Sequence, residues 1–233
     1  MSTPSSTHSP TPTVHTPTLP SATIRQRRAA AALLILGVIA YILPTALHGN
    51  PPIDDAAATL DYVRDRGLWT IAHFANVGAV MMWAAAVALL KTSGMLGQGR
   101  GAVAQVAWGI AGGAFAIYYG IHAVGLWSAA NQLDTVARDL VLERTESLLL
   151  ILGSSAFVAQ AVLGVAVALF GLALIGTTRA SRILGAVGIV TGTGWCVGAL
   201  LINFGIIVPF TTLGWAWAVA VALVVFRAAR HSA

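Results

Sequence analysis

Two histidines, His73 and His122, lie inside long apolar segments, where a polar side chain is costly unless it faces other protein groups. At about 1.5 Å per helical residue, His73 lies about 6 Å inside Trp69, and His122 lies about 7.5 Å inside Trp127. Because consecutive segments run antiparallel, we expect both imidazoles at the same depth, within about 10 Å of each other, close enough to share a ligand. His48, at the end of the preceding apolar segment, can approach the same level.

Facing imidazoles allow several kinds of chemistry. Two neutral rings can ligate a haem iron axially, and with a third donor, His48 or a loop carboxylate, they can bind a transition metal. One histidine can instead relay a proton or bind an anionic headgroup. In a purely structural role, His73 bonds Asn76 or a backbone carbonyl, and His122 pairs with Tyr118 or Tyr119 across a helix interface. The sequence holds neither a Cys-x-x-Cys-His nor a His-Glu-x-x-His motif, so these alternatives stay open.

The composition places these histidines in a membrane. The chain is 57% hydrophobic and 9% charged, with a mean hydropathy of +0.80. A soluble domain needs charge along every element, but here all eight acidic residues fall in two stretches: Asp54, Asp55, Asp61 and Asp65, and Asp134, Asp139, Glu143 and Glu146. The sequence therefore predicts an integral membrane protein.

Six segments are apolar enough to cross about 30 Å of hydrocarbon, which takes roughly 20 helical residues. They lie at about 29–47, 68–90, 102–129, 148–175, 183–203 and 206–226, the last two joined by little more than Phe204 and Gly205. Lipid offers no partner to unpaired backbone groups, and the period of a barrel strand is absent. The fold class predicted is all-α, a polytopic six-span transmembrane bundle formed by residues 25–233.

Basic residues in the connections predict the orientation of this bundle. They divide nine to four between its two ends, with Arg64, Arg66, Arg138 and Arg144 forming the smaller group. The larger group is expected in the cytoplasm with both termini, which predicts a bacterial inner-membrane protein whose acidic loops lie outside. The excess of positive charge faces anionic lipid and indicates no affinity for nucleic acid.

The remaining segments are expected to be a tail and two loops. Residues 1–24 are rich in Ser, Thr and Pro and carry no charge, which predicts a disordered cytoplasmic tail. Each outer loop has apolar residues at helical spacing, so we expect a short amphipathic helix at 53–63 and another at 133–141. The similarity of 60–65 to 133–139 is consistent either with an internal repeat or with chance.

Polar and small residues mark the predicted interior faces. Stripes on the second, third and fourth spans carry Asn76, Tyr119, Gln105 and Gln160, and the fifth span ends at Asn203, so these side chains can line a pocket or a path. Glycines spaced Gly-x-x-x-Gly favour close helix packing within the chain, with oligomer contacts as the alternative. The pairs are Gly109 and Gly113, Gly188 and Gly192, and Gly194 and Gly198.

A run of residues also resembles a known group of proteins. Gly67-Leu68-Trp69 leads through His73 to Ala84-Ala85-Ala86, an aromatic and polar third span follows, and Arg182 to Gly185 opens the fifth. In these features residues 29–226 resemble uncharacterised six-helix integral membrane proteins of high-GC bacteria. The resemblance implies the architecture and brings no activity with it.

Three functions follow as hypotheses. Packing features alone favour an accessory or structural membrane subunit, surrounded by the lipid bilayer and associating as a homo-oligomer or within a larger complex. A redox, haem or metal-binding protein would use His73 and His122, with His48 as a further metal ligand, and a small transporter or channel would use Gln105, Gln160 and Asn203. No Ser or Cys nucleophile has a histidine and an acid at readable spacing, so an enzyme is not favoured.

The orientation is testable with single cysteines in a Cys196→Ala background, since Cys196 is the only native cysteine. We expect an impermeant maleimide to label Asp61→Cys and Asp139→Cys in intact cells and to leave Arg179→Cys unlabelled, because basic residues stay in the cytoplasm. Labelling of the Arg179 position alone would show that the bundle is inverted.

Overall fold

The computed structural model describes residues 20–176 and 178–230, which are almost entirely helical. The elements in this part are α1 (Ser21–His48), α2 (Ala56–Arg64), α3 (Trp69–Thr92), α4 (Gln98–Gly120), the π-helical turn η1 (Ile121–Gly125), α5 (Leu126–Gln132), α6 (Arg138–Leu174), α7 (Arg179–Leu200) and α8 (Phe204–Arg230). Because α4, η1 and α5 form one continuous helical segment, Gln98–Gln132, the described chain has six helical segments long and apolar enough to span a membrane. The predicted six-span, all-α fold class is confirmed.

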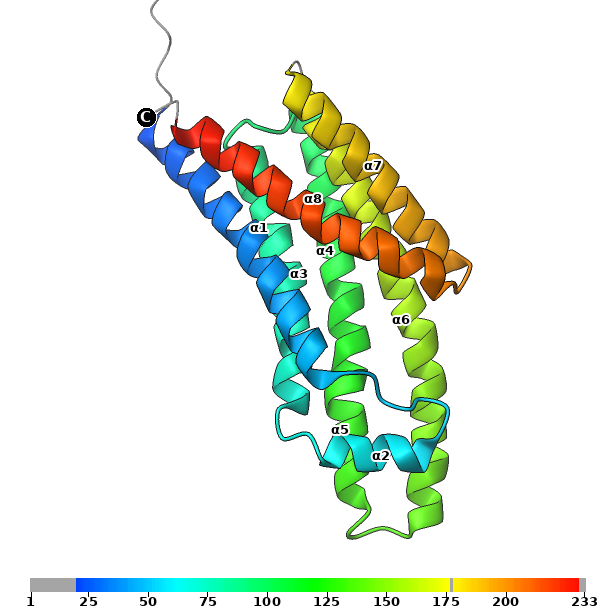
Figure 1. Cartoon of the computed structure of the whole chain (residues 1–233). Coiled ribbons are helices and arrows are strands. Elements are labelled where there is room, and N and C mark those ends of the chain that lie inside the picture. Colours follow the sequence, from blue (N-terminus) through cyan, green and yellow to red (C-terminus); the bar gives the residue numbers. More distant parts are fainter. Residues whose placement is uncertain (1–19, 177, 231–233) are drawn as a thin grey trace, which may run out of the picture.

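The segments run alternately up and down, so the start of α1 and the end of α8 lie at the same end of the bundle (Figure 1). Helix α1 packs on α3 and α8, α4 packs on α3 and α6, and α7 lies between α6 and α8. At the opposite end, the short helix α2 lies across α5 and the start of α6. We call that end the α2 end.

Glycine allows α6 and α7 to approach closely. A Cβ added at Gly171 would lie 2.6 Å from the backbone nitrogen of Ile189, and one at Gly164 would lie 2.6 Å from that of Cys196. Gly188 and Gly192 face the same contact from α7, so their predicted packing role is confirmed. Gly194 and Gly198 of the third pair pack instead on α8, against Phe210 and against Ile206 and Ile207.

Gly109 and Gly113 differ from the other two pairs. An added Cβ would meet nothing within 4 Å at either position, so the predicted packing role within the chain is wrong for them. Their spacing is the same, but the α4 face on which they lie contacts no other helix in the described chain.

The loop between the third and fourth spans also differs from expectation. Residues 133–137 form a turn, and Arg138–Val141 belong to α6, so the amphipathic helix predicted at 133–141 is wrong. Helix α6 starts ten residues before the predicted span and is 37 residues long, about 55 Å, which exceeds the hydrocarbon thickness. The first turns of α6 are charged, so they belong to the helix but lie outside the apolar segment from which the span was predicted. The first loop does hold the predicted helix, α2, so the two loops do not share a repeated structure.

Two smaller boundaries shift as well. Helix α7 ends at Leu200 and α8 begins at Phe204, so residues 201–203 make the hairpin turn, with Ile202 at a positive φ of 51°. Residues 21–24, assigned to the tail, form the first turn of α1. The rest of the predicted tail, residues 1–19, lies outside the described residues.

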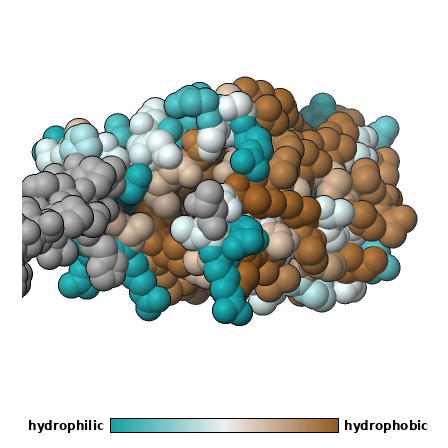
Figure 2. Space-filling model, turned by 90° about the horizontal axis from the view of Figure 1, so that it is seen from above, coloured by the Kyte–Doolittle hydropathy of each residue, from teal (hydrophilic) through white to brown (hydrophobic). Residues whose placement is uncertain are grey.

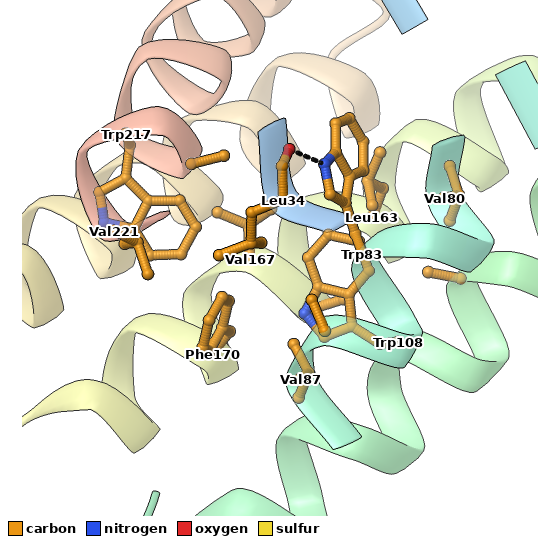
Figure 3. Packing of buried hydrophobic residues seen from close by; sticks show 14 of the residues in the cluster. Leu34, Val80, Trp83, Val87, Trp108, Leu163, Val167, Phe170, Trp217 and Val221 are labelled. Atoms are coloured by element: carbon orange, nitrogen blue, oxygen red, sulfur yellow. Dashed lines mark hydrogen bonds between the residues drawn. The ribbon is translucent and has the colours of Figure 1, made fainter. Parts of the chain in front are cut away.

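Buried apolar side chains form two clusters that share no residue. The larger one fills the bundle and includes Trp83, Trp108, Phe170 and Trp217 (Figure 3). The smaller one, the cap cluster, lies at the α2 end and consists of Leu60, Val63, Trp69, Leu126, Ala129, Ala130 and Val141. Outside these clusters, hydrophobic residues cover a large continuous part of the visible surface (Figure 2), as expected for a chain surrounded by lipid.

The glycine contact makes a stability prediction. We expect Gly171→Ala to lower the free energy of unfolding by about 1–3 kcal/mol, because the added methyl group would overlap the α7 backbone. Gly109→Ala is the matched control and should be neutral or stabilising by up to about 1 kcal/mol, since its methyl group meets open space. Unfolding in detergent measures both variants. Equal stabilities would contradict the close α6 to α7 contact.

Candidate functional site

Three histidines from three helical segments meet between the two hydrophobic clusters. The ring centroids of His73 on α3 and His122 on η1 are 4.2 Å apart, within the predicted 10 Å. His48, the last residue of α1, lies 4.7 Å from the His73 ring and 6.2 Å from the His122 ring. We call these residues the histidine cluster. His73 and His122 are buried, and His48 is half-buried.

A backbone hydrogen bond orients the His73 ring. Its Nδ1 lies 2.6 Å from the carbonyl oxygen of Trp69, one helical turn earlier. A carbonyl oxygen can only accept, so Nδ1 carries a proton, and in the neutral ring Nε2 holds a free lone pair. Metal-binding histidines commonly have this arrangement, with one nitrogen donating to a carbonyl and the other left for the ion. The structural role predicted for His73, a bond to a backbone carbonyl, is equally satisfied by this contact.

The π-helical turn positions His122. A π-turn widens the helix and disturbs its regular hydrogen bonds, and such turns occur often at functional sites. The indole nitrogen of Trp69 donates to the His122 carbonyl at 3.0 Å, and this bond connects α3 to η1. The Trp69 ring itself lies 4.3 Å from the His73 ring and 5.0 Å from the His122 ring, so it packs against both.

Helix α2 positions His48 in turn. The hydroxyl of Tyr62 donates to the His48 carbonyl at 2.6 Å, where α1 ends. Gly49 follows with a φ of 64°, a backbone conformation that favours glycine, and a Cβ there would lie 2.6 Å from the Tyr62 hydroxyl. The chain therefore turns away directly after His48, and its side chain stays against the cluster.

The histidine cluster is also where unpartnered buried nitrogens gather. In the described part of the chain, ten buried side-chain nitrogen or oxygen atoms have no hydrogen-bond partner, and four of them belong to this cluster: His48 Nδ1, His73 Nε2, and both ring nitrogens of His122. Each such atom costs about 1–3 kcal/mol when left unsatisfied. Among the described residues, no group of three or more His, Cys, Asp or Glu side chains already comes together as a metal site.

The haem hypothesis can be tested against these distances. Two imidazoles that bind one iron from opposite sides, each at about 2 Å, have ring centroids about 6 Å apart, with the porphyrin between them. The His73 and His122 rings are in direct contact at 4.2 Å. As they lie, these two residues do not fit axial haem ligation.

The other predicted pocket residues are distributed over the bundle. Asn76 and Tyr119 are buried near the cluster, where the Asn76 amide donates to Thr45 at 3.3 Å and the Tyr119 ring lies 5.7 Å from His73. Tyr118, rather than Tyr119, is the tyrosine whose ring pairs with that of His122, at 5.7 Å.

The predicted path residues do not meet. Gln105 is exposed and accepts a hydrogen bond from Lys91, and Gln160 accepts one from the indole of Trp195 at 2.7 Å. Asn203 is exposed in the turn between α7 and α8. The structure does not bring these three side chains together along one path.

Two parts of the site had no readable signal in the sequence. The bond from Tyr62 to His48 joins a helix in a loop to the end of a span, which spacing along one helix cannot indicate. The π-turn lies between Gly120 and Gly125, and nothing in Ile121–Gly125 marks it in advance.

Comparison with known proteins finds no match: no family model, no curated protein and no solved structure matches the chain. The site must therefore be interpreted from its own chemistry.

The bond between Trp69 and His122 can be tested by mutation. Trp69→Phe removes the indole donor and leaves a buried carbonyl in the π-turn, so we expect the free energy of unfolding to fall by about 1–3 kcal/mol. Trp127→Phe is the control, because Trp127 packs on the cap cluster and its indole makes no hydrogen bond in the described part of the chain. Equal losses in thermal unfolding would mean that only ring packing matters.

Proposed function

We propose that this integral membrane protein binds one transition-metal ion through His48, His73 and His122. The observation that carries the proposal is the gathering of three imidazoles with four unpartnered ring nitrogens in a buried site. Imidazole is a good ligand for zinc, copper, iron and nickel, and a single ion could satisfy one nitrogen from each ring.

The spacing of the rings supports a metal ion better than a haem. Three imidazoles bound tetrahedrally to one ion, with metal to nitrogen bonds of about 2.0–2.1 Å, have ring centroids about 5 Å apart. Two of the three distances in the cluster, 4.2 and 4.7 Å, are shorter than this, and the third, 6.2 Å, is longer. Binding therefore requires the rings to rotate. Rotation of the His122 ring breaks no hydrogen bond, because neither of its nitrogens makes one.

The position of the cluster suggests the role of the ion. The positive-inside pattern supports an α2 end on the outer side of a bacterial inner membrane, and with that orientation the ion would reach the site from outside. An accessory role within a larger membrane complex is compatible with this proposal, since a bound ion does not by itself require catalysis. Transport through the bundle is less well supported, because Gln105, Gln160 and Asn203 lie apart.

Metal analysis of the detergent-purified protein, prepared without a histidine tag, tests the proposal. After exposure to Cu²⁺, Zn²⁺ or Ni²⁺ and gel filtration, we expect about one ion per chain for at least one of these metals. His73→Ala and His122→Ala should each reduce affinity by at least about 10-fold, because two imidazoles do not complete the site. With Cu²⁺, an electron paramagnetic resonance spectrum reports the number of bound nitrogens.

The control uses the three histidines outside the described residues. A variant with His8→Ala, His15→Ala and His231→Ala should keep the full metal content. His122→Gln, which keeps a polar side chain, separates loss of metal from loss of folding when thermal unfolding is measured in parallel. Absence of bound metal in the folded wild type, or loss of metal only in the triple variant, would contradict the proposal.

A further inference from the structure

A cavity at the α2 end lies between the end of α1 and the start of α3, and His48 of the histidine cluster is part of its lining. Its volume is about 340 Å³, within the range of ligand pockets. One wall is apolar and faces outward, and it is formed by Leu43 and Leu47 of α1 and by Leu68 and Ile71 of the α3 start, each more than half exposed. The other wall is polar and includes Asp65 and Arg66. We propose that this cavity binds the headgroup of a phospholipid with a primary ammonium group, of the phosphatidylethanolamine type.

The phosphate side of the headgroup has two partners. The guanidinium of Arg66 lies over the Tyr62 ring, with its central carbon 4.0 Å from the ring centroid, and this contact holds the charge at the cavity. The Arg66 Nε is buried without a hydrogen-bond partner. Helix α3 begins at the same wall without a side-chain cap. The Trp69 N–H already donates to the Arg66 carbonyl at 2.9 Å, but the helix dipole and the N–H groups of Thr70 and Ile71 also favour an anion.

The ammonium side explains why a zwitterionic lipid fits better than an anionic one. Asp65 lines the same cavity, and its carboxylate would repel a headgroup that carries only negative charge. In the described chain the ion pair present is Arg64 with Asp134, so neither Asp65 nor Arg66 is already neutralised by a partner. A phosphate near Arg66 and an ammonium near Asp65 would satisfy both.

The apolar wall accounts for the acyl chains. Leu43 and Leu47 continue the exposed face of α1 away from the polar wall, and Ile71 does the same on α3. A lipid whose headgroup occupies the cavity can therefore lay its chains along this face. His48 also lines this cavity, so a bound headgroup would lie next to one of the proposed metal ligands.

Native mass spectrometry of delipidated protein in detergent tests the inference. Titration with phosphatidylethanolamine should show binding at least about 10-fold tighter than with phosphatidylcholine or phosphatidylglycerol of the same acyl chains. Arg66→Gln should reduce binding of all three lipids, and Asp65→Asn should selectively remove the preference for phosphatidylethanolamine over phosphatidylglycerol. Arg64→Gln, adjacent in sequence but outside the cavity, is the matched control and should bind as the wild type does.

Several outcomes would overturn the inference. Equal binding of the three lipids by the wild type, or unchanged binding by Arg66→Gln, would show that the cavity does not recognise the headgroup. Competition by inorganic phosphate at concentrations similar to those of the lipid would identify a simple anion site. Arg66→Lys, which keeps the charge, is the control for misfolding of Arg66→Gln and should retain part of the affinity. Metal content, measured on the same variants, should stay unchanged, because neither Asp65 nor Arg66 is one of the proposed metal ligands.

Discussion

A chain surrounded by hydrocarbon must form the hydrogen bonds of its polar groups internally, and in this bundle tryptophan indoles make several of those between helices. Four of them each donate a hydrogen bond to a different helix. Trp83 of α3 bonds the Leu34 carbonyl of α1 (Figure 3), and Trp217 of α8 bonds the Leu184 carbonyl of α7. The other two are Trp69 to His122, between α3 and η1, and Trp195 to Gln160, between α7 and α6. Such bonds fix the rotation of each helix about its axis, and therefore which side chains face inward.

The histidine cluster departs from this rule, and the departure is its main chemical feature. Its backbone is well bonded, through Trp69 to the His122 carbonyl and through Tyr62 to the His48 carbonyl. Four of its ring nitrogens are buried without a hydrogen-bond partner, whereas the Nδ1 of His73 bonds the Trp69 carbonyl. Supporting residues thus hold the three rings in place while their donor atoms stay available, which is the arrangement that a binding site needs.

Hydropathy and helix rise were sufficient to predict the six spans and the meeting of His73 with His122, because both depend on position along a helix. They could not distinguish Gly109 and Gly113 from Gly188 and Gly192, since the spacing is the same and only the neighbouring helix differs. They also missed the start of α6, where Arg138 and the acidic residues after it continue the helix out of the apolar region. Contacts between a loop and a span, such as Tyr62 to His48, depend on tertiary structure alone.

The separation of the two hydrophobic clusters has a consequence for motion. The histidine cluster lies against Trp69 of the cap cluster, and α2 contributes Leu60 and Val63 to that cluster without joining the core of the bundle. A local opening that lifts α2 would therefore break contacts within the cap cluster and leave the packing of the bundle core intact. The free energy of such an opening depends on a small, separate set of contacts. Backbone amide hydrogens near the histidines can therefore exchange with water much faster than the whole protein unfolds.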